Sequence, residues 1–129
     1  MWLGVSVENN TFLKRIKPLK KSEANVKFLS LEPLLGRVAN LDTHGIDWVI
    51  TGGESGPGAR PIEYSWVAEI QKICKQTKTP FFFKQWGKKE FNINKNDPTI
   101  DAKSLQHAKG GCQLDGVVYK EMPRQMVLA

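Results

Sequence analysis

Residues 47–87 read DWVITGGESGPGARPIEYSWVAEIQKICKQTKTPFFFKQWG, and this stretch decides the fold. Its two ends, Asp47 to Thr51 and Pro80 to Trp86, are short runs of β-branched and aromatic residues followed by glycine, which favours strands. Between them, Tyr64 to Gln76 is predicted to be a helix that Ser65 caps. Its apolar residues recur at three- and four-residue steps: Trp66, Val67, Ile70, Ile73 and Cys74. Two strands joined by so long a connection are parallel.

Two further strands precede this unit. Trp2 to Val7 and Val26 to Leu31 have the same strand character, and each ends in polar residues. Thr11 to Lys21 is a weaker helix, interrupted by Pro18, and the link from Leu34 to Ile46 is loop-like. The chain is therefore predicted to be α/β, with helices on one side of a curving sheet. We expect either a partial (half) TIM-type barrel or an open parallel sheet of about four strands, with a small C-terminal hairpin.

The character of the chain changes after Gly87. Lys88 to Lys103 is polar and predicted to be a loop, whereas Gly110 to Tyr119 is predicted to be a hairpin with Asp115-Gly116 at its turn. We place a boundary near residue 90. Residues 1–90 then form the partial α/β barrel, and residues 91–129 form the loop and hairpin extension.

Composition excludes several classes of protein. The 129 residues carry 19 Lys and Arg against 13 Asp and Glu, a net charge of +6 that favours anionic partners such as nucleic acid. No apolar run approaches the roughly 20 residues that a membrane helix needs, and no secretory signal is visible. Two cysteines are too few for a disulfide scaffold and indicate a reducing compartment, so we expect a cytoplasmic protein.

Charged or polar residues follow each of the four predicted strands: Glu8, Glu32, Glu54, and the pair Lys84 and Gln85. In parallel α/β sheets ligands bind at the carboxyl ends of strands, so these side chains are ligand-binding candidates. Converging carboxylates could bind a metal, hold a substrate amine, or raise the pKa of one carboxyl group. The alternative is that each glutamate caps a turn or pairs locally, for example with Lys84. No metal ligand set is predicted.

The loop GGESGPGARP, residues 52–61, is the most distinctive segment. Gly52 and Gly53 let the backbone approach a ligand closely, and successive amides with Arg60 could bind an anion. The alternative is a tight turn stiffened by Pro57 and Pro61. The loop is neither a Walker A loop nor a dinucleotide fingerprint.

Other chemically reactive residues are predicted to be structural. His44 and His107 lie in presumed loops without ligand partners, so both are expected at the surface. Cys74 lies on the apolar face of the predicted helix and is expected in the core. Cys112 has no evident nucleophilic role. Trp86 either stacks on a ligand or closes the core.

The motifs WLGVSVEN, FLSLEPLLG, DWVITGGESGPGARP and PFFFKQWG resemble an uncharacterised family of radical-SAM-like proteins associated with phages and mobile elements. The resemblance implies a partial TIM-type barrel and chemistry with S-adenosylmethionine and a 4Fe–4S cluster. The positions that resemble cofactor-contacting strand ends are Ser6, Glu8, Glu32, Gly52, Gly53 and Glu54. The cysteine-rich cluster motif of that family is absent from this chain, so no cofactor is expected in this chain alone.

The strand pattern predicts a partial barrel that binds a small polar ligand at the strand ends. The resemblance implies that the protein is phage-associated and, without the cluster motif, lacks independent catalysis. Whether it is an enzyme is left open. The alternative is a basic module that binds nucleic acid through the lysine-rich segment beginning at Lys14. A parallel sheet uncovered on one face, with two open edges, predicts a homodimer or a complex with a separately encoded N-terminal half.

Overall fold

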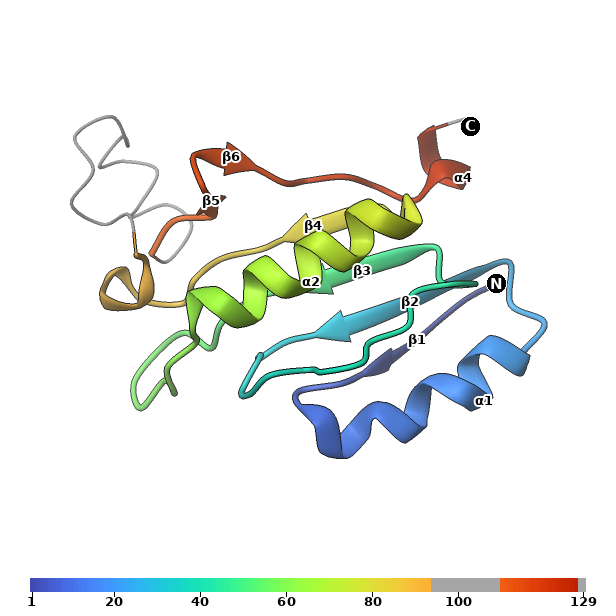
Figure 1. The fold of residues 1–129 in the computed structure, drawn as a ribbon, viewed down its shortest axis with the longest axis horizontal. Coiled ribbons are helices and arrows are strands. Elements are labelled where there is room, and N and C mark those ends of the chain that lie inside the picture. The colour runs from blue at the N-terminus through green and yellow to red at the C-terminus, as the bar shows by residue number, and fades with distance from the viewer. Residues whose placement is uncertain (94–109, 128–129) are drawn as a thin grey trace.

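The computed structural model describes residues 1–93 and 110–127 (Figure 1). Its centre is a four-stranded parallel sheet in the order β1-β2-β3-β4, which confirms the predicted α/β class. The strands are β1 Trp2–Ser6, β2 Val26–Leu31, β3 Trp48–Thr51 and β4 Phe81–Phe83. The last strand is shorter than predicted, because after Phe83 the chain turns toward the glycine loop, where Gly53 N–H donates to the Gln85 carbonyl at 2.8 Å.

Helix α2, Tyr64–Thr77, lies across β3 and β4 (Figure 1) and confirms the predicted crossover. The predicted cap is wrong: Glu63 is the N-cap residue, and its side chain makes no capping hydrogen bond. The helix ends at Lys78, whose backbone is left-handed with φ 56°. Its buried face is formed by Val67, Ile70 and Cys74, as the spacing predicts.

The weaker helix divides into a 3₁₀ segment, η1 Asn10–Arg15, and α1 Ile16–Lys21. The Asn9 side chain caps η1 by accepting the Thr11 N–H at 2.9 Å. Pro18 lies in the first turn of α1. Backbone N–H groups there have no partner within the helix, so the proline costs α1 no hydrogen bond. The proline therefore interrupts the helix less than predicted.

The core lies between one face of the sheet and the segments that connect the strands. Leu29, Val49 and Phe81 are in register across β2, β3 and β4 and are almost fully buried. Residues 32–47 link β2 to β3 without a helix, as predicted, and cover the same face. They contribute Leu34, Val38, Leu41 and Ile46 to the core.

The opposite face carries aromatic side chains and is not covered by either helix. Trp48 is its centre, with ring centroids at 6.3 Å from Trp2, 6.1 Å from Phe28 and 5.9 Å from Phe82. Phe28 lies across β1 at Gly4, where a Cβ atom would overlap the ring. We call this the open face. The described strands form an open sheet, and they do not establish closure into a barrel.

The C-terminal segment forms the predicted hairpin, β5 Gln113–Leu114 and β6 Val117–Val118. Asp115 and Gly116 have φ angles of 53° and 79°, as a tight primed turn requires. Beyond β6, Tyr119–Glu121 runs antiparallel along the outer edge of β4. The expectation of two open edges is therefore wrong, because this segment covers one of them.

The remaining elements are η2, Lys89–Phe91, and α4, Arg124–Val127. The predicted loop from Lys88 to Lys103 is described only to Ile93; the rest of it and His107 lie outside the described residues. Within the part of the chain that the structure describes, no helix is long and apolar enough to cross a membrane.

Candidate functional site

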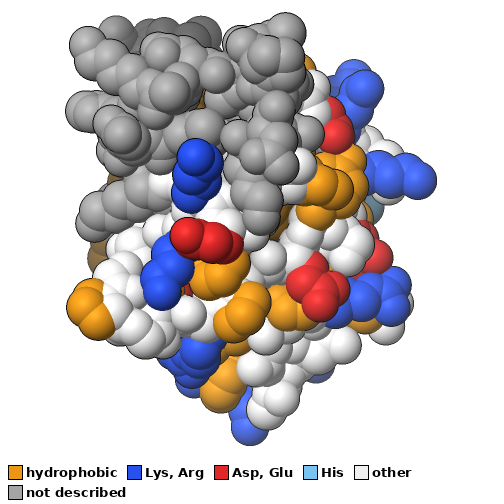
Figure 2. All heavy atoms as spheres, turned by 90° about the vertical axis from the view of Figure 1, so that its left-hand side faces the viewer, with side chains coloured by type: hydrophobic (Ala, Val, Ile, Leu, Met, Phe, Trp, Pro, Cys, Tyr) orange, Lys and Arg blue, Asp and Glu red, His pale blue; other side chains and the backbone are white. Residues whose placement is uncertain are grey.

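The site is built by the register of the parallel strands. Leu31, Thr51 and Phe83 are paired across the sheet, so Glu32, Gly52 and Lys84 follow them side by side. Figure 2 looks onto these carboxyl ends, where acidic and basic side chains lie next to one another. The structure therefore places Glu32, Gly52 and Lys84 side by side, and the contact of Glu32 with Lys84 is the local pairing given above as the alternative. Ligand binding by these side chains stays a prediction.

Glu32 and Lys84 form the centre of the site. Lys84 Nζ lies 3.6 Å from Glu32 Oε2, and the exposed fractions of the side chains are 27% for Glu32 and 53% for Lys84. Gly52 lies between them, and a Cβ atom there would come within 3.2 Å of Lys84 Cβ and 3.4 Å of Glu32 Oε2. The missing side chain at Gly52 thus lets these opposite charges meet over the sheet while staying open to solvent.

Glu8 and Ser6 extend the site to β1. Ser6 pairs with Ser30 across the sheet. Arg15, from η1, lies 3.7 Å from the Glu8 carboxylate and donates to the Ser6 carbonyl at 2.8 Å. The sequence interpretation did not assign Arg15 to the site. Its contact with the end of β1 depends on how η1 packs against the strand, which the sequence pattern does not reveal.

Glu54 has a different environment from the other two glutamates. Its carboxylate accepts hydrogen bonds from Arg60 Nε at 2.7 Å and Nη2 at 3.3 Å. These hydrogen bonds lower the pKa of Glu54 and raise that of Arg60. Glu54 therefore pairs locally, which was the alternative to a ligand-binding role. The Arg60 charge is already neutralised within the loop.

Gly53 and Gln85 fix the glycine loop to the end of β4. A Cβ atom at Gly53 would overlap the Trp86 carbonyl oxygen, so the glycine allows a close approach of the chain's own backbone. The predicted approach to a ligand stays a prediction. The Gln85 side chain donates to the Gly53 carbonyl at 3.4 Å. Trp86 is fully buried and donates to the Gln113 carbonyl at 2.9 Å, so it closes the core.

Lys120 reaches the open face from the C-terminal segment. Its Nζ donates to the carbonyls of Phe83 at 2.7 Å and Lys84 at 3.1 Å and lies 4.6 Å from the Phe82 ring centroid. Sequence reasoning missed this lysine, because no local pattern indicates that residues 119–121 pair with β4. Its charge adds to that of Lys84 at the same edge of the site.

The histidine and the two cysteines considered in the sequence analysis lie outside the site, as His44 is engaged with Asp42 and both cysteines are buried. His44 is exposed and contacts Asp42 at 2.8 Å; hydrogen bonds from the His44 backbone and from Lys20 hold the pKa of Asp42 well below its usual range. Burial raises the pKa of the Cys74 thiol to about 12, and Cys112 is buried as well. Among the described residues, no three His, Cys, Asp or Glu side chains could hold a metal ion.

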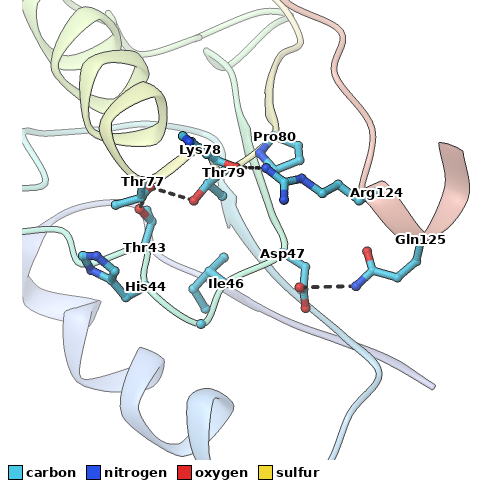
Figure 3. A pocket seen from close by; sticks show the side chains of 11 residues that line it. Thr43, His44, Ile46, Asp47, Thr77, Lys78, Thr79, Pro80, Arg124 and Gln125 are labelled. Atoms are coloured by element: carbon cyan, nitrogen blue, oxygen red, sulfur yellow. Dashed lines mark hydrogen bonds between the residues drawn. The ribbon is translucent and has the colours of Figure 1, made fainter. Parts of the chain in front are cut away.

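A pocket of about 350 Å³ lies at the opposite, amino end of β3 and β4 (Figure 3). Thr77 links the hydroxyls of Thr43 and Thr79 at 2.5 and 2.7 Å, and Arg124 donates to the Lys78 carbonyl at 3.2 Å. Most of its polar groups are therefore engaged with one another. They fasten α4 and the end of α2 to the sheet.

Fold and site together define a parallel α/β protein with a charged site at the strand ends of an open face. A model for a family described as "Protein of unknown function (DUF5131)" matches residues 1–123, and the chain belongs to this family. Neither the curated proteins nor the solved structures contain a significant match. The match confirms an uncharacterised family, whereas radical-SAM ancestry and phage association stay predictions.

Proposed function

We propose that the protein binds a small zwitterionic ligand at the carboxyl ends of β1 to β4. One observation carries this proposal: Glu32 and Lys84 present opposite, partly exposed charges 3.6 Å apart over Gly52, which has no side chain to separate them. Such partly exposed ion pairs contribute only about 0–1 kcal/mol. A ligand ammonium and a ligand carboxylate can therefore replace the two partners at little energetic cost.

The surroundings favour a ligand that is charged at one end and aromatic at the other. Ser6, Ser30 and Glu8 adjoin the ion pair on the side of β1, and Phe82 and Trp48 lie on the same face toward the amino ends. The resemblance to radical-SAM-like proteins suggests S-adenosylmethionine as the first compound to test. It carries an α-ammonium, an α-carboxylate and an aromatic base, and the aromatic side chains of the open face suit stacking on that base.

A four-iron cluster does not fit the described residues. Cluster iron is held by cysteine thiolates, and Cys74 and Cys112 are both buried, with the Cys74 thiol kept protonated by its raised pKa. We therefore derive no radical step. The function proposed for this chain is ligand binding, in the cytoplasm that its free cysteines favour.

Calorimetry of the full chain with S-adenosylmethionine, methionine and adenosine tests the proposal. We expect S-adenosylmethionine to bind, and Glu32→Gln and Lys84→Gln each to weaken binding about tenfold through loss of one charged hydrogen bond. Glu63→Gln is the matched control, because Glu63 is exposed and its side chain makes no capping hydrogen bond. The proposal would be contradicted if none of the three compounds binds. It would also be contradicted if Glu63→Gln weakens binding as much as Glu32→Gln and Lys84→Gln do.

A further inference from the structure

A second pocket, of about 710 Å³, lies between the C-terminal half of α2 and residues 119–124, which follow β6. Figure 1 shows both of these segments beside β4, whose first residue also lines the pocket. The volume falls within the roughly 300–1,000 Å³ that is typical of small-molecule sites. The residues that it shares with the pocket in Figure 3 are Lys78, Thr79, Pro80 and Arg124. The pocket is therefore large enough for an organic molecule, and it is separate from the charged site at the strand ends.

The buried part of the lining is apolar. Phe81 and Cys74 are each 1% exposed, and Tyr119 and Met122 are half-buried. The ring centroids of Phe81 and Tyr119 lie 5.5 Å apart in an edge-to-face arrangement. Aromatic rings and a thioether favour contact with an aromatic or aliphatic group. This part of the pocket therefore suits the apolar body of a ligand.

The exposed part of the lining is basic. Lys75, Lys78 and Arg124 are exposed, and within the described ranges none of them has a carboxylate within 4.0 Å. Of the described residues that line the pocket, only Glu121 carries a carboxylate. Its Oε1 already accepts the Phe81 N–H at 3.1 Å. Three cations against one carboxylate leave the pocket positively charged, which favours an anionic ligand.

The main chain around the pocket is already hydrogen-bonded. At the end of α2, the Cys74 carbonyl accepts the Thr79 N–H at 2.8 Å, and the Lys78 carbonyl accepts from Arg124 at 3.2 Å (Figure 3). These bonds occupy carbonyls at the helix end that would otherwise repel an anion. The N–H groups of Lys78 and Phe81 also donate within the chain. Phosphate sites usually present free backbone N–H groups, so this pocket favours a carboxylate that side chains hold.

We propose that this pocket binds a small organic carboxylate with an aromatic or aliphatic body. The body packs against Phe81, Tyr119 and Met122, and the carboxylate pairs with Arg124 and Lys75. A guanidinium has several N–H donors in a planar fork, so Arg124 can keep its bond to the Lys78 carbonyl and still bind a carboxylate. A ligand ammonium gains nothing here, because the basic residues repel it. The ligand class therefore differs from that of the strand-end site.

An NMR titration of the ¹⁵N-labelled full chain with cinnamate tests this, with cinnamyl alcohol, cinnamylamine and phenyl phosphate as comparison compounds. We expect cinnamate to bind about tenfold more tightly than the alcohol or the amine, through one charged hydrogen bond. The largest amide shift changes should be those of Cys74, Lys78 and Met122.

Two variants locate the carboxylate. Arg124→Gln should weaken cinnamate binding about tenfold, and Lys75→Gln about threefold, because an exposed ion pair contributes less. Neither variant should change binding of the alcohol. Lys72→Gln is the matched control, since Lys72 is exposed on the same helix and does not line the pocket.

The other outcomes overturn the proposal. Equal binding of cinnamate and the alcohol, or an equal effect of Lys75→Gln, Arg124→Gln and Lys72→Gln, would show that the basic residues select no carboxylate. Tighter binding of phenyl phosphate would assign the pocket to phosphate ligands. Shift changes centred on Glu32 and Lys84 would place the anion at the strand ends, and binding of no compound would exclude the site.

Discussion

Replacing Gly53 by alanine tests how the glycine loop is held against β4. A Cβ atom at this position would overlap the Trp86 carbonyl oxygen and lie 3.1 Å from Ile62 Cγ2. The first obstacle is backbone, which cannot rotate away as the end of a flexible side chain can. The loop and the segment after β4 must therefore separate to admit the methyl group.

The magnitude follows from what that separation breaks. Gly53 N–H donates to the Gln85 carbonyl at 2.8 Å, and a backbone hydrogen bond contributes about 1 kcal/mol. Trp86 is fully buried, with its ring centroid 4.8 Å from that of Phe83. Truncating such a buried aromatic side chain costs about 3–5 kcal/mol, and displacing it loses part of that. We expect Gly53→Ala to lower the free energy of unfolding by about 2–4 kcal/mol.

Urea denaturation followed by tryptophan fluorescence measures this change, with Gly56→Ala as the control. Gly56 belongs to the same loop, and no described atom lies within 4 Å of its Cβ position. Its φ of +90° still makes alanine unfavourable, by about 1–2 kcal/mol. If Gly53→Ala is no more destabilising than Gly56→Ala, the close approach at Trp86 does not hold the loop.

Three further predictions concern charge and burial. Lys120→Met should lower the free energy of unfolding in urea by about 1–3 kcal/mol, since it removes hydrogen bonds to two carbonyls and the contact with the Phe82 ring; a loss equal to that of Lys21→Met would contradict this. Because the pKa of Glu54 is lowered, its pairing with Arg60 stabilises the fold above the unfolded-state pKa and is lost as pH falls through the folded-state pKa. An NMR titration of that carboxyl should therefore show a midpoint below 4.5, and a midpoint at or above 4.5 would exclude the pair. The Cys74 thiol, whose pKa is raised to about 12, should react with an alkylating reagent at neutral pH only on unfolding, as mass spectrometry of the labelled peptide would show.

Local patterns predicted most of the sheet and the larger helix. The bounds of β2 agree with the prediction, and α2 begins at Tyr64 as its apolar spacing indicates. Parallel pairing followed from connections too long for hairpins. The N-cap was wrong, because capping depends on where the chain enters the helix and not on residue type alone. The contact of residues 119–121 with β4 joins segments far apart in sequence, so no periodicity reveals it.

For the site, the sequence predicted which strand ends lie together but not which side chains pair there. Parallel strands bring their carboxyl ends to one edge, and this places Glu32 and Lys84 together. The position of a residue in the sequence did not predict which side chain it pairs with. Glu54 forms an ion pair with Arg60 because the glycine loop folds back on itself. Arg15 and Lys120 could not be assigned from sequence, because each reaches the site through tertiary packing.

The most direct test of the central claim is a map of amide chemical-shift changes when S-adenosylmethionine is added to the ¹⁵N-labelled full chain. Binding at the strand ends predicts the largest changes at Ser6, Glu8, Glu32, Gly52 and Lys84. The pocket at the opposite end of the sheet, lined by Thr43 and Arg124, should show none. Changes centred on that pocket, or no changes at saturating ligand, would contradict the account.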